Sequence, residues 1–285
     1  EGLPRFVNII LSMARAQGKT MIAGIVLNYS FLIETIGLSN QEFLISSINF
    51  DQTMKLYTYV KSMMERIVEI EPFKSLANET GVQIQSRGIK ANTDSNSVFT
   101  ISFESGKFDG KHFRLAIADE VGELTSADGI SKITSGQVNT DGSRFIEIST
   151  AYPKPDVPFH QEQKVLIEVM ERDYDRTADD QLCLIWSQDN LEEVFQPETW
   201  AKANPLLNHP DLKVNLLKGL ISERDSKMLI GKLSDFQVKN MNCWLLADSN
   251  SFLDLEDIEK AIVPEFDIKR KRVYMGFDAS MFSDN

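Results

Sequence analysis

The sequence has no long apolar run and only two cysteines, and each scarcity narrows the class of protein. Its longest apolar stretches, 6–11 and 273–277, fall far short of the roughly 20 residues that cross a bilayer. It also shows no basic start followed by an apolar centre, the pattern of a secretory signal, which favours the cytosol. Cys183 and Cys243 lie far apart and outside metal-ligand spacing, so we expect free thiols in a reducing compartment.

Positive charge is also scarce. The chain has 30 lysines and arginines against 42 acidic residues, a formal net charge of −12, and its densest basic run is only 269–272. A surface that grips duplex DNA normally clusters lysine and arginine, because neutralising phosphates supplies most of the affinity. The composition therefore argues against strong DNA binding by this segment alone. A hydrophobic content of 42% in 285 residues suits one large or two medium soluble domains.

Strand and helix patterns alternate in the first half of the chain. Short apolar runs predict buried strands, and amphipathic stretches between them predict helices. We expect strands at 6–11, 43–48, 115–118 and 145–148, and helices at 20–36 and 51–70. The apolar residues of the first helix share one face, as in a helix that packs on a core. They are Ile22, Ile25, Val26 and Tyr29. This alternation predicts an α/β fold, in which helices cover both faces of a mainly parallel sheet.

The character of the chain changes near residue 188. Residues 197–246 are expected to be almost wholly helical, with Pro197 at a helix start. The candidate helices there are 213–223 and 228–238, and a further strand is expected at 272–277. We therefore predict four parts. These are an α/β core at 1–187, a helical subdomain at 188–247, a connector at 248–271, and at 272–285 the first strand of a truncated domain.

The run from Met13 to Thr20 follows the first strand and opens the first helix, which is the setting of a phosphate-binding loop. Gly18 would let the backbone approach the phosphates closely, and Lys19 would neutralise the β- and γ-phosphates. The Thr20 hydroxyl would hold Mg²⁺. The remaining predicted nucleotide-binding residues are Arg15, Ala16 and Gln17. Met13 stands where the pattern usually has its first glycine, so the motif is not a complete match.

Two further strand ends carry groups for the same chemistry. Asp119 ends one predicted strand, where it can bind Mg²⁺, and Glu120 beside it can polarise a water for attack on the γ-phosphate. Ser149 and Thr150 end the next strand, where hydroxyl groups can sense the γ-phosphate and couple hydrolysis to motion. Arg15 is expected to stabilise charge on the γ-phosphate, and pairing with a nearby acid is the alternative. Ligands of open sheets bind at the carboxyl ends of strands, so we expect these groups to converge.

Together these residues resemble the large terminase subunit of tailed bacteriophages, the motor that packages DNA into the capsid. The loop at 15–20 is similar to the deviant Walker A motif of this family, which commonly carries an arginine and often lacks the first glycine. Residues 46–53 resemble the strand–turn–helix that follows it, and 108–110 resemble the approach to Walker B. Downstream, the runs WAKANP at 200–205 and NMNCW at 240–244 resemble patterns seen in this family, the first of them in one branch.

Physical reasons alone also account for these downstream residues. Asn204-Pro205 is expected to end a helix, and Trp200 and Trp244 to anchor the core of the helical subdomain without catalytic work. At the end of the sequence, the run GFDAS at 276–280 resembles the strand that opens the ribonuclease H-type nuclease domain of terminases. The resemblance makes Asp278 a ligand of a catalytic divalent metal, Mg²⁺ or Mn²⁺, in the full protein. Its other acids are expected beyond residue 285, so this chain alone should not cut DNA.

The resemblance implies a P-loop NTPase of the ASCE type that uses ATP and Mg²⁺ to translocate double-stranded viral DNA. It implies as partners double-stranded DNA, the portal protein and the small terminase subunit. The assembly would be a homo-oligomeric ring on the capsid that is monomeric in solution, without membrane contact, in the cytoplasm of the bacterial host.

Two other interpretations stay open. A helicase-like nucleic-acid translocase would share the core, but it needs further helicase motifs and a second RecA-like lobe. The helical run after residue 188 and the Gly-Phe-Asp strand at 276–278 argue against this interpretation. A catalytically inactive P-loop interaction module would keep the fold without turnover. The substituted Met13 and the acidic composition give this second alternative some weight.

Overall fold

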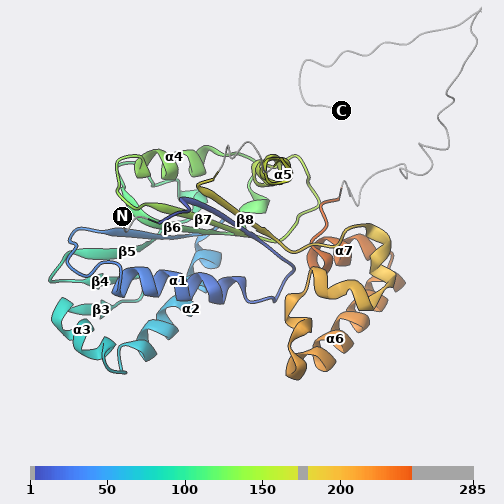
Figure 1. The fold of residues 1–285 in the computed structure, drawn as a ribbon, viewed down its shortest axis with the longest axis horizontal. Helices are drawn as coiled ribbons and strands as arrows, with labels where there is room; N and C mark the ends of the chain where they lie inside the picture. The colour runs from blue at the N-terminus through green and yellow to red at the C-terminus, as the bar shows by residue number, and fades with distance from the viewer. Residues whose placement is uncertain (1–3, 173–178, 246–285) are drawn as a thin grey trace, which may run out of the picture. The chain divides into compact units, whose positions relative to one another are not determined.

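A mostly parallel sheet forms the centre of this computed structural model, which describes residues 4–172 and 179–245. The eight strands lie in the order β3-β4-β5-β2-β6-β7-β1-β8 (Figure 1). In chain order they are β1 (Asn8–Ser12), β2 (Glu42–Ser46), β3 (Val82–Ile84), β4 (Gly88–Ala91), β5 (Asn96–Thr100), β6 (Phe113–Asp119), β7 (Arg144–Ser149) and β8 (Gln181–Ile185). Neighbours from β5 to β8 in this order pair in parallel, whereas β3 and β4 form an antiparallel edge. The predicted α/β fold is therefore confirmed.

Helices cover both faces of the sheet. On one face lie α1 (Lys19–Leu32), α2 (Phe50–Ile67) and α3 (Phe73–Thr80), and on the other lie α4 (Asp128–Gln137) and α5 (Pro158–Glu171) (Figure 1). Because both faces are covered, the inner strands are apolar throughout rather than alternating, as in β2, where Phe43, Leu44 and Ile45 are all fully buried. The packed sheet thus fixes the positions of the strand ends.

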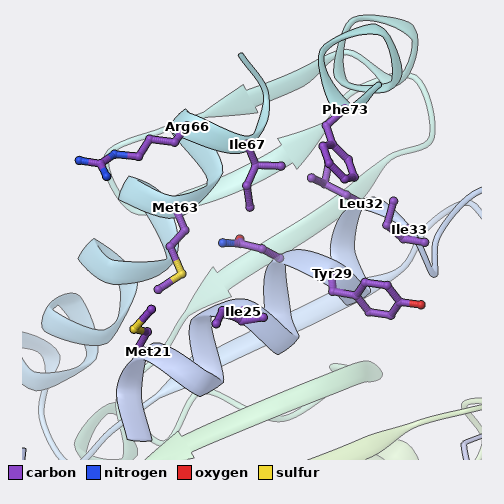
Figure 2. Close-up of a pocket in the computed structure, with 10 residues that line it drawn as sticks. Met21, Ile25, Tyr29, Leu32, Ile33, Met63, Arg66, Ile67 and Phe73 are labelled. Atoms are coloured by element: carbon purple, nitrogen blue, oxygen red, sulfur yellow. The ribbon is translucent and has the colours of Figure 1, made fainter. Parts of the chain in front are cut away.

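The exposed face of α1 corrects one prediction. Ile22, Ile25 and Tyr29, expected on the packed face, are 44%, 52% and 56% exposed. The buried face instead carries Leu27 and Phe31, which pack in the core under the sheet. Because α1 is apolar on both faces, spacing alone could not tell which one is buried. The outer face lines an open cavity of about 420 Å³ together with side chains of α2 and α3 (Figure 2).

The region after β8 is helical, but it is more broken than predicted. It contains three 3₁₀ segments, η3 (Leu191–Phe195), η4 (Pro197–Lys202) and η5 (Pro205–Asn208), followed by α6 (Pro210–Leu229) and α7 (Leu233–Met241). The helix expected at 213–223 lies inside α6. The helix expected at 228–238 is wrong, because Gly231, with a φ of 66°, separates α6 from α7.

The two tryptophans behave differently. Trp200 is fully buried among side chains of η3, α6 and α7, so it anchors this region as predicted. Trp244 packs instead against α5, where its ring stacks on His160 with 4.4 Å between the ring centroids. Trp244 therefore packs on a helix that covers the sheet. The prediction that it anchors the core of the helical subdomain is wrong.

Several predictions of domain organisation stay predictions. Contacts group Glu1–Ala247 into one compact unit, and the predicted connector at 248–271 and strand at 272–277 lie outside the described residues. Both cysteines are free thiols. Among the helices that the structure describes, none has the length and apolar character needed to span a membrane.

Candidate nucleotide-binding site

The loop between β1 and α1 turns through two left-handed residues. These are Ala16, with a φ of 59°, and Gly18, with a φ of 86°. Met13 is not among the residues with positive φ, and its side chain is 3% exposed and packs in the core. Glycine is needed mainly where φ is positive or a backbone must approach closely, so this loop keeps its turn without glycine at position 13. The incomplete motif is therefore compatible with a well-formed loop.

Lys19 lies at the centre of the loop. Its Nζ atom donates hydrogen bonds to the carbonyl oxygens of Met13 and Ala14, at 2.6 and 2.8 Å, and to Thr150 Oγ1 at 2.8 Å. Burial lowers the pKa of Lys19 to about 8, although the nearby carboxylates of Glu120 and Asp119 act in the opposite direction. The loop thus holds a buried amine next to two acids.

The acids stand where β6 ends. Burial, followed by the charge of Glu120, raises the pKa of Asp119 to about 7. Glu120 has a left-handed backbone with a φ of 58°, and its N–H donates to Asp119 Oδ1 at 3.0 Å. Ser47, after β2, donates to the carbonyl oxygen of Asp119 at 3.0 Å. A non-glycine residue in this conformation costs about 1–3 kcal/mol, and such strain gathers at functional sites.

The end of β7 connects the Lys19 loop to the turn that contains Asp119 and Glu120, the acidic turn. Thr150 accepts the hydrogen bond from Lys19, and Ser149 Oγ accepts one from the N–H of Gly122 at 2.9 Å. A Cβ atom at Gly122 would lie only 2.6 Å from Ser149 Oγ, so the turn after Glu120 needs a glycine at this point. The predicted site residues of the three strands therefore converge at one edge of the sheet.

The helical region also contacts the loop. The Gln17 side chain donates to Asn204 Oδ1 at 3.0 Å and accepts from the N–H of Leu206 at 3.1 Å. The N–H of Arg15 donates to the carbonyl oxygen of Lys239 at 2.9 Å. The Gln17 side chain thus connects the loop to the region after β8. Asn204, which was expected only to end a helix, also accepts a hydrogen bond from the loop.

Arg15 is exposed to solvent at the loop. No carboxylate within residues 4–172 and 179–245 lies at ion-pair distance from its side chain. Burial is the main cause of the lowered pKa of Lys19 and of Lys239, and the positive charge of Arg15 lowers both further.

Three residues of the site escaped the sequence analysis. Tyr152 donates its phenol hydrogen to Glu120 Oε2 at 2.8 Å, and Lys239 Nζ lies 3.5 Å from the centroid of the Tyr152 ring. Asn242 accepts from the N–H of Ala151 at 2.7 Å and donates to Ser12 Oγ at 3.0 Å. Each had a signal nearby, since Tyr152 directly follows the Ser149–Ala151 segment, Asn242 lies inside the run at 240–244 that resembles a family pattern, and Lys239 directly precedes that run.

The residues present suit a magnesium ion that arrives with a nucleotide. Among the described residues, no three His, Cys, Asp or Glu side chains are grouped as a metal site. Mg²⁺ at nucleotide sites is usually held by one or two protein oxygens together with phosphates and waters, rather than by a cage of protein ligands. Thr20 and Asp119, the predicted ligands, carry oxygen donors of the kind that Mg²⁺ prefers. Asp278, the predicted nuclease ligand, lies outside the described residues.

Strand order and site together define the class of protein. The strand that leads into the Lys19 loop, β1, is separated from the strand that ends in Asp119-Glu120, β6, by β7. Parallel strands, a lysine loop before a helix and paired acids two strands away are the arrangement of a P-loop NTPase of the ASCE type.

The comparisons with known proteins identify the family within this class. The family described as terminase large subunit, ATPase domain, matches residues 2–166, and the one described as terminase large subunit, endonuclease domain, matches residues 175–285. The chain therefore belongs to the large terminase subunit family. No curated protein sequence matches it.

Two solved structures share the fold of this chain. The large terminase of bacteriophage HK97 superposes with a TM-score of 0.62 at 20% identity, over 84% of this chain and 47% of that protein. The large terminase of a thermophilic bacteriophage gives a TM-score of 0.51 at 14% identity, over 88% of this chain and 52% of that protein. The chain spans about half the length of these two proteins.

Proposed function

We propose that this protein is the ATP-hydrolysing motor subunit that drives double-stranded viral DNA into a capsid. Membership of the large terminase family supplies the class of reaction. The observation that carries the ATPase proposal is the direct hydrogen bond between Lys19 and Thr150, which joins the phosphate loop to the strand that also contacts the acidic turn. A solvated lysine at a helix start would make no such contacts.

The loop residues would bind the phosphates of ATP. The backbone N–H groups around Gly18 and at the start of α1 form an anion site, and Lys19 adds a positive charge inside it. To reach the phosphates, the Lys19 amine exchanges its bonds to the carbonyl oxygens of Met13 and Ala14 for phosphate oxygens. Arg15 forms no ion pair with a carboxylate among the described residues, so its guanidinium group can contact the γ-phosphate.

Glu120 would act on the attacking water. Its carboxylate lies beside Asp119 at the sheet edge, where it can accept a hydrogen bond from the water and align it with the γ-phosphate. Mg²⁺, held by Thr20, Asp119 and phosphate oxygens, would neutralise charge on the β- and γ-phosphates. Thr150, bonded to Lys19, and Ser149, bonded to the turn after Glu120, would report the loss of the γ-phosphate to the rest of the subunit.

The proposal extends to the whole protein. By the chemistry of its family, the subunit would work as a ring at the portal of the capsid with the small terminase subunit, in the bacterial cytoplasm. Asp278 would bind a divalent metal in the nuclease domain of the full protein. Magnesium is proposed for the ATPase site, because its protein ligands are a hydroxyl and a carboxylate.

The direct test replaces one carboxylate by its amide. Glu120→Gln keeps the shape of the side chain but cannot serve as the base, so turnover of ATP should fall by about 100-fold or more while MgATP still binds. Glu104→Gln, at an exposed position in the short 3₁₀ segment η1 (Phe103–Ser105), is the matched control and should hydrolyse ATP normally. Unchanged turnover in Glu120→Gln would rule out the proposed role. In a packaging reaction with cognate capsids, the same variant should protect no DNA from nuclease.

A further inference from the structure

Tyr152 contacts the proposed catalytic glutamate directly. Its hydroxyl group donates to Glu120 Oε2 at 2.8 Å, and no other side chain in the described ranges 4–172 and 179–245 hydrogen-bonds that carboxylate. Burial, followed by the charge of Glu120, raises the pKa of Tyr152, so the phenol keeps its proton and can only donate to the carboxylate. One carboxylate oxygen is thereby held, and the other remains available to a water.

Lys239 reaches the same tyrosine from the helical region. Its ammonium group lies 3.5 Å from the centroid of the Tyr152 ring, a cation–π distance. Its carbonyl oxygen accepts a hydrogen bond from the N–H of Arg15 in the phosphate loop at 2.9 Å. One residue of α7 therefore contacts both the loop and the tyrosine that holds Glu120.

We propose that Tyr152 is a positioning residue for Glu120, and that Lys239 fixes Tyr152, so that the helical region sets the orientation of the general base. The inference rests on the proposed function of Glu120. A glutamate side chain has several rotatable bonds, and a base works efficiently only when its reacting oxygen is held in line with the water. The hydrogen bond from Tyr152 supplies that constraint, and the cation over the ring both fixes the ring and strengthens the phenol as a donor.

Steady-state kinetics of point variants test the proposal. Tyr152→Phe keeps the ring and removes only the hydroxyl, so kcat should fall about tenfold with KM for ATP and MgATP affinity unchanged. Lys239→Met should lower kcat in the same way. Lys239→Arg keeps a cation over the ring and should therefore keep the wild-type kcat. The double variant Tyr152→Phe/Lys239→Met should be no slower than Tyr152→Phe alone, because both changes remove one constraint.

A second buried tyrosine provides the control. The Tyr57 hydroxyl also donates its single hydrogen inside the protein, within 2.7 Å of the carbonyl oxygens of both Gln85 and Gly88, but it lies away from the acidic turn. Tyr57→Phe should therefore lower the melting temperature without changing kcat. A role of Tyr152 in stability alone would produce the same result, so an unchanged or raised kcat in Tyr152→Phe overturns the proposal.

Glu120→Gln separates this inference from the proposed function. If that variant still hydrolyses ATP, Glu120 is not the base and both proposals fail. If it is inactive while Tyr152→Phe is fully active, only the positioning role fails. Should circular dichroism show that Tyr152→Phe is unfolded, Lys239→Met decides alone: a loss of kcat at unchanged KM supports the proposal, and an unchanged kcat overturns it.

Discussion

The two sides of the nucleotide site are built from different kinds of groups. The sheet side carries charge, with the buried Lys19 next to the half-buried Asp119-Glu120 pair and the pKa of Lys19 lowered to about 8 by burial. The helical side contributes mainly amide groups and backbone atoms, such as Asn204 and Asn242, whose hydrogen bonds are nearly all satisfied within the protein. The two sides therefore have different roles: the sheet carries the groups that react, and the helical region holds those groups in position.

This division predicts opposite results for substitutions on the two sides. Changes to the buried amides of the helical side, unlike changes to Lys239, should first cost stability, because they leave buried polar groups without partners. Changes on the sheet side should first cost rate, because buried charges that serve catalysis add little to stability and can reduce it. Two sets of variants test stability, from the larger expected effect to the smaller, and a third tests rate.

Asn242 should give the largest loss of stability. Its side chain bonds the N–H of Ala151, the hydroxyl of Ser12 and the carbonyl oxygen of Trp186, so it joins the ends of β7, β1 and β8. Asn242→Ala should reduce the free energy of unfolding by about 2–4 kcal/mol, measured by urea denaturation. Asn40→Ala is the control, because Asn40 has a similar left-handed φ of 59° at an exposed position. Equal losses in the two variants would show that the side-chain bonds of Asn242 contribute nothing.

The bond between Gln17 and Asn204 should give a smaller, coupled effect. We expect Gln17→Ala and Asn204→Ala to show a coupling of about 1 kcal/mol in a double-mutant cycle on unfolding, since the two amides bond at 3.0 Å. Gln137 in α4 bonds elsewhere, to the carbonyl oxygens of Phe113 and Arg144, so its cycle with Asn204 should be additive. A coupling of zero for Gln17 and Asn204 would mean that the loop is not fastened through this contact.

Thr150 tests the sheet side. Thr150→Val keeps the shape but removes the acceptor for Lys19, and we expect kcat to fall about tenfold with little change in stability. Thr150→Ser should restore the rate. Thr35→Val removes a buried hydroxyl that bonds only the carbonyl oxygen of Phe31, far from the site in sequence, and should leave kcat unchanged. A loss of stability without loss of rate in Thr150→Val would contradict the proposed division.

The chemical side of the site was predictable because its signals are local. A lysine and a hydroxyl residue between a strand and a helix, and two acids at the end of an apolar strand, are recognisable within a few residues of sequence. The parallel sheet follows from the same apolar runs. The place of Met13 could not be judged from sequence, because it depends on which loop residues take positive φ, and these are Ala16 and Gly18.

The helical side was not predictable because its contacts join distant parts of the chain. Gln17 and Asn204 are 187 positions apart, and nothing in either segment indicates the other. The buried face of α1 was missed for a related reason, since packing against neighbours decides it. The break between α6 and α7 had a local signal, because Gly231 takes a left-handed φ of 66° just after α6. The Glu120–Tyr152 pair, 32 positions apart, is likewise a product of the fold.

The most direct test of the central claim is a calorimetric titration of ATP into the protein with and without Mg²⁺. The account predicts saturable binding that depends on Mg²⁺ in the wild-type protein, that is lost in Lys19→Ala and that persists in Lys55→Ala, an exposed lysine of α2. If the wild-type protein shows no Mg²⁺-dependent binding of ATP, the proposed ATPase function is contradicted. The interpretation as a catalytically inactive interaction module would then remain.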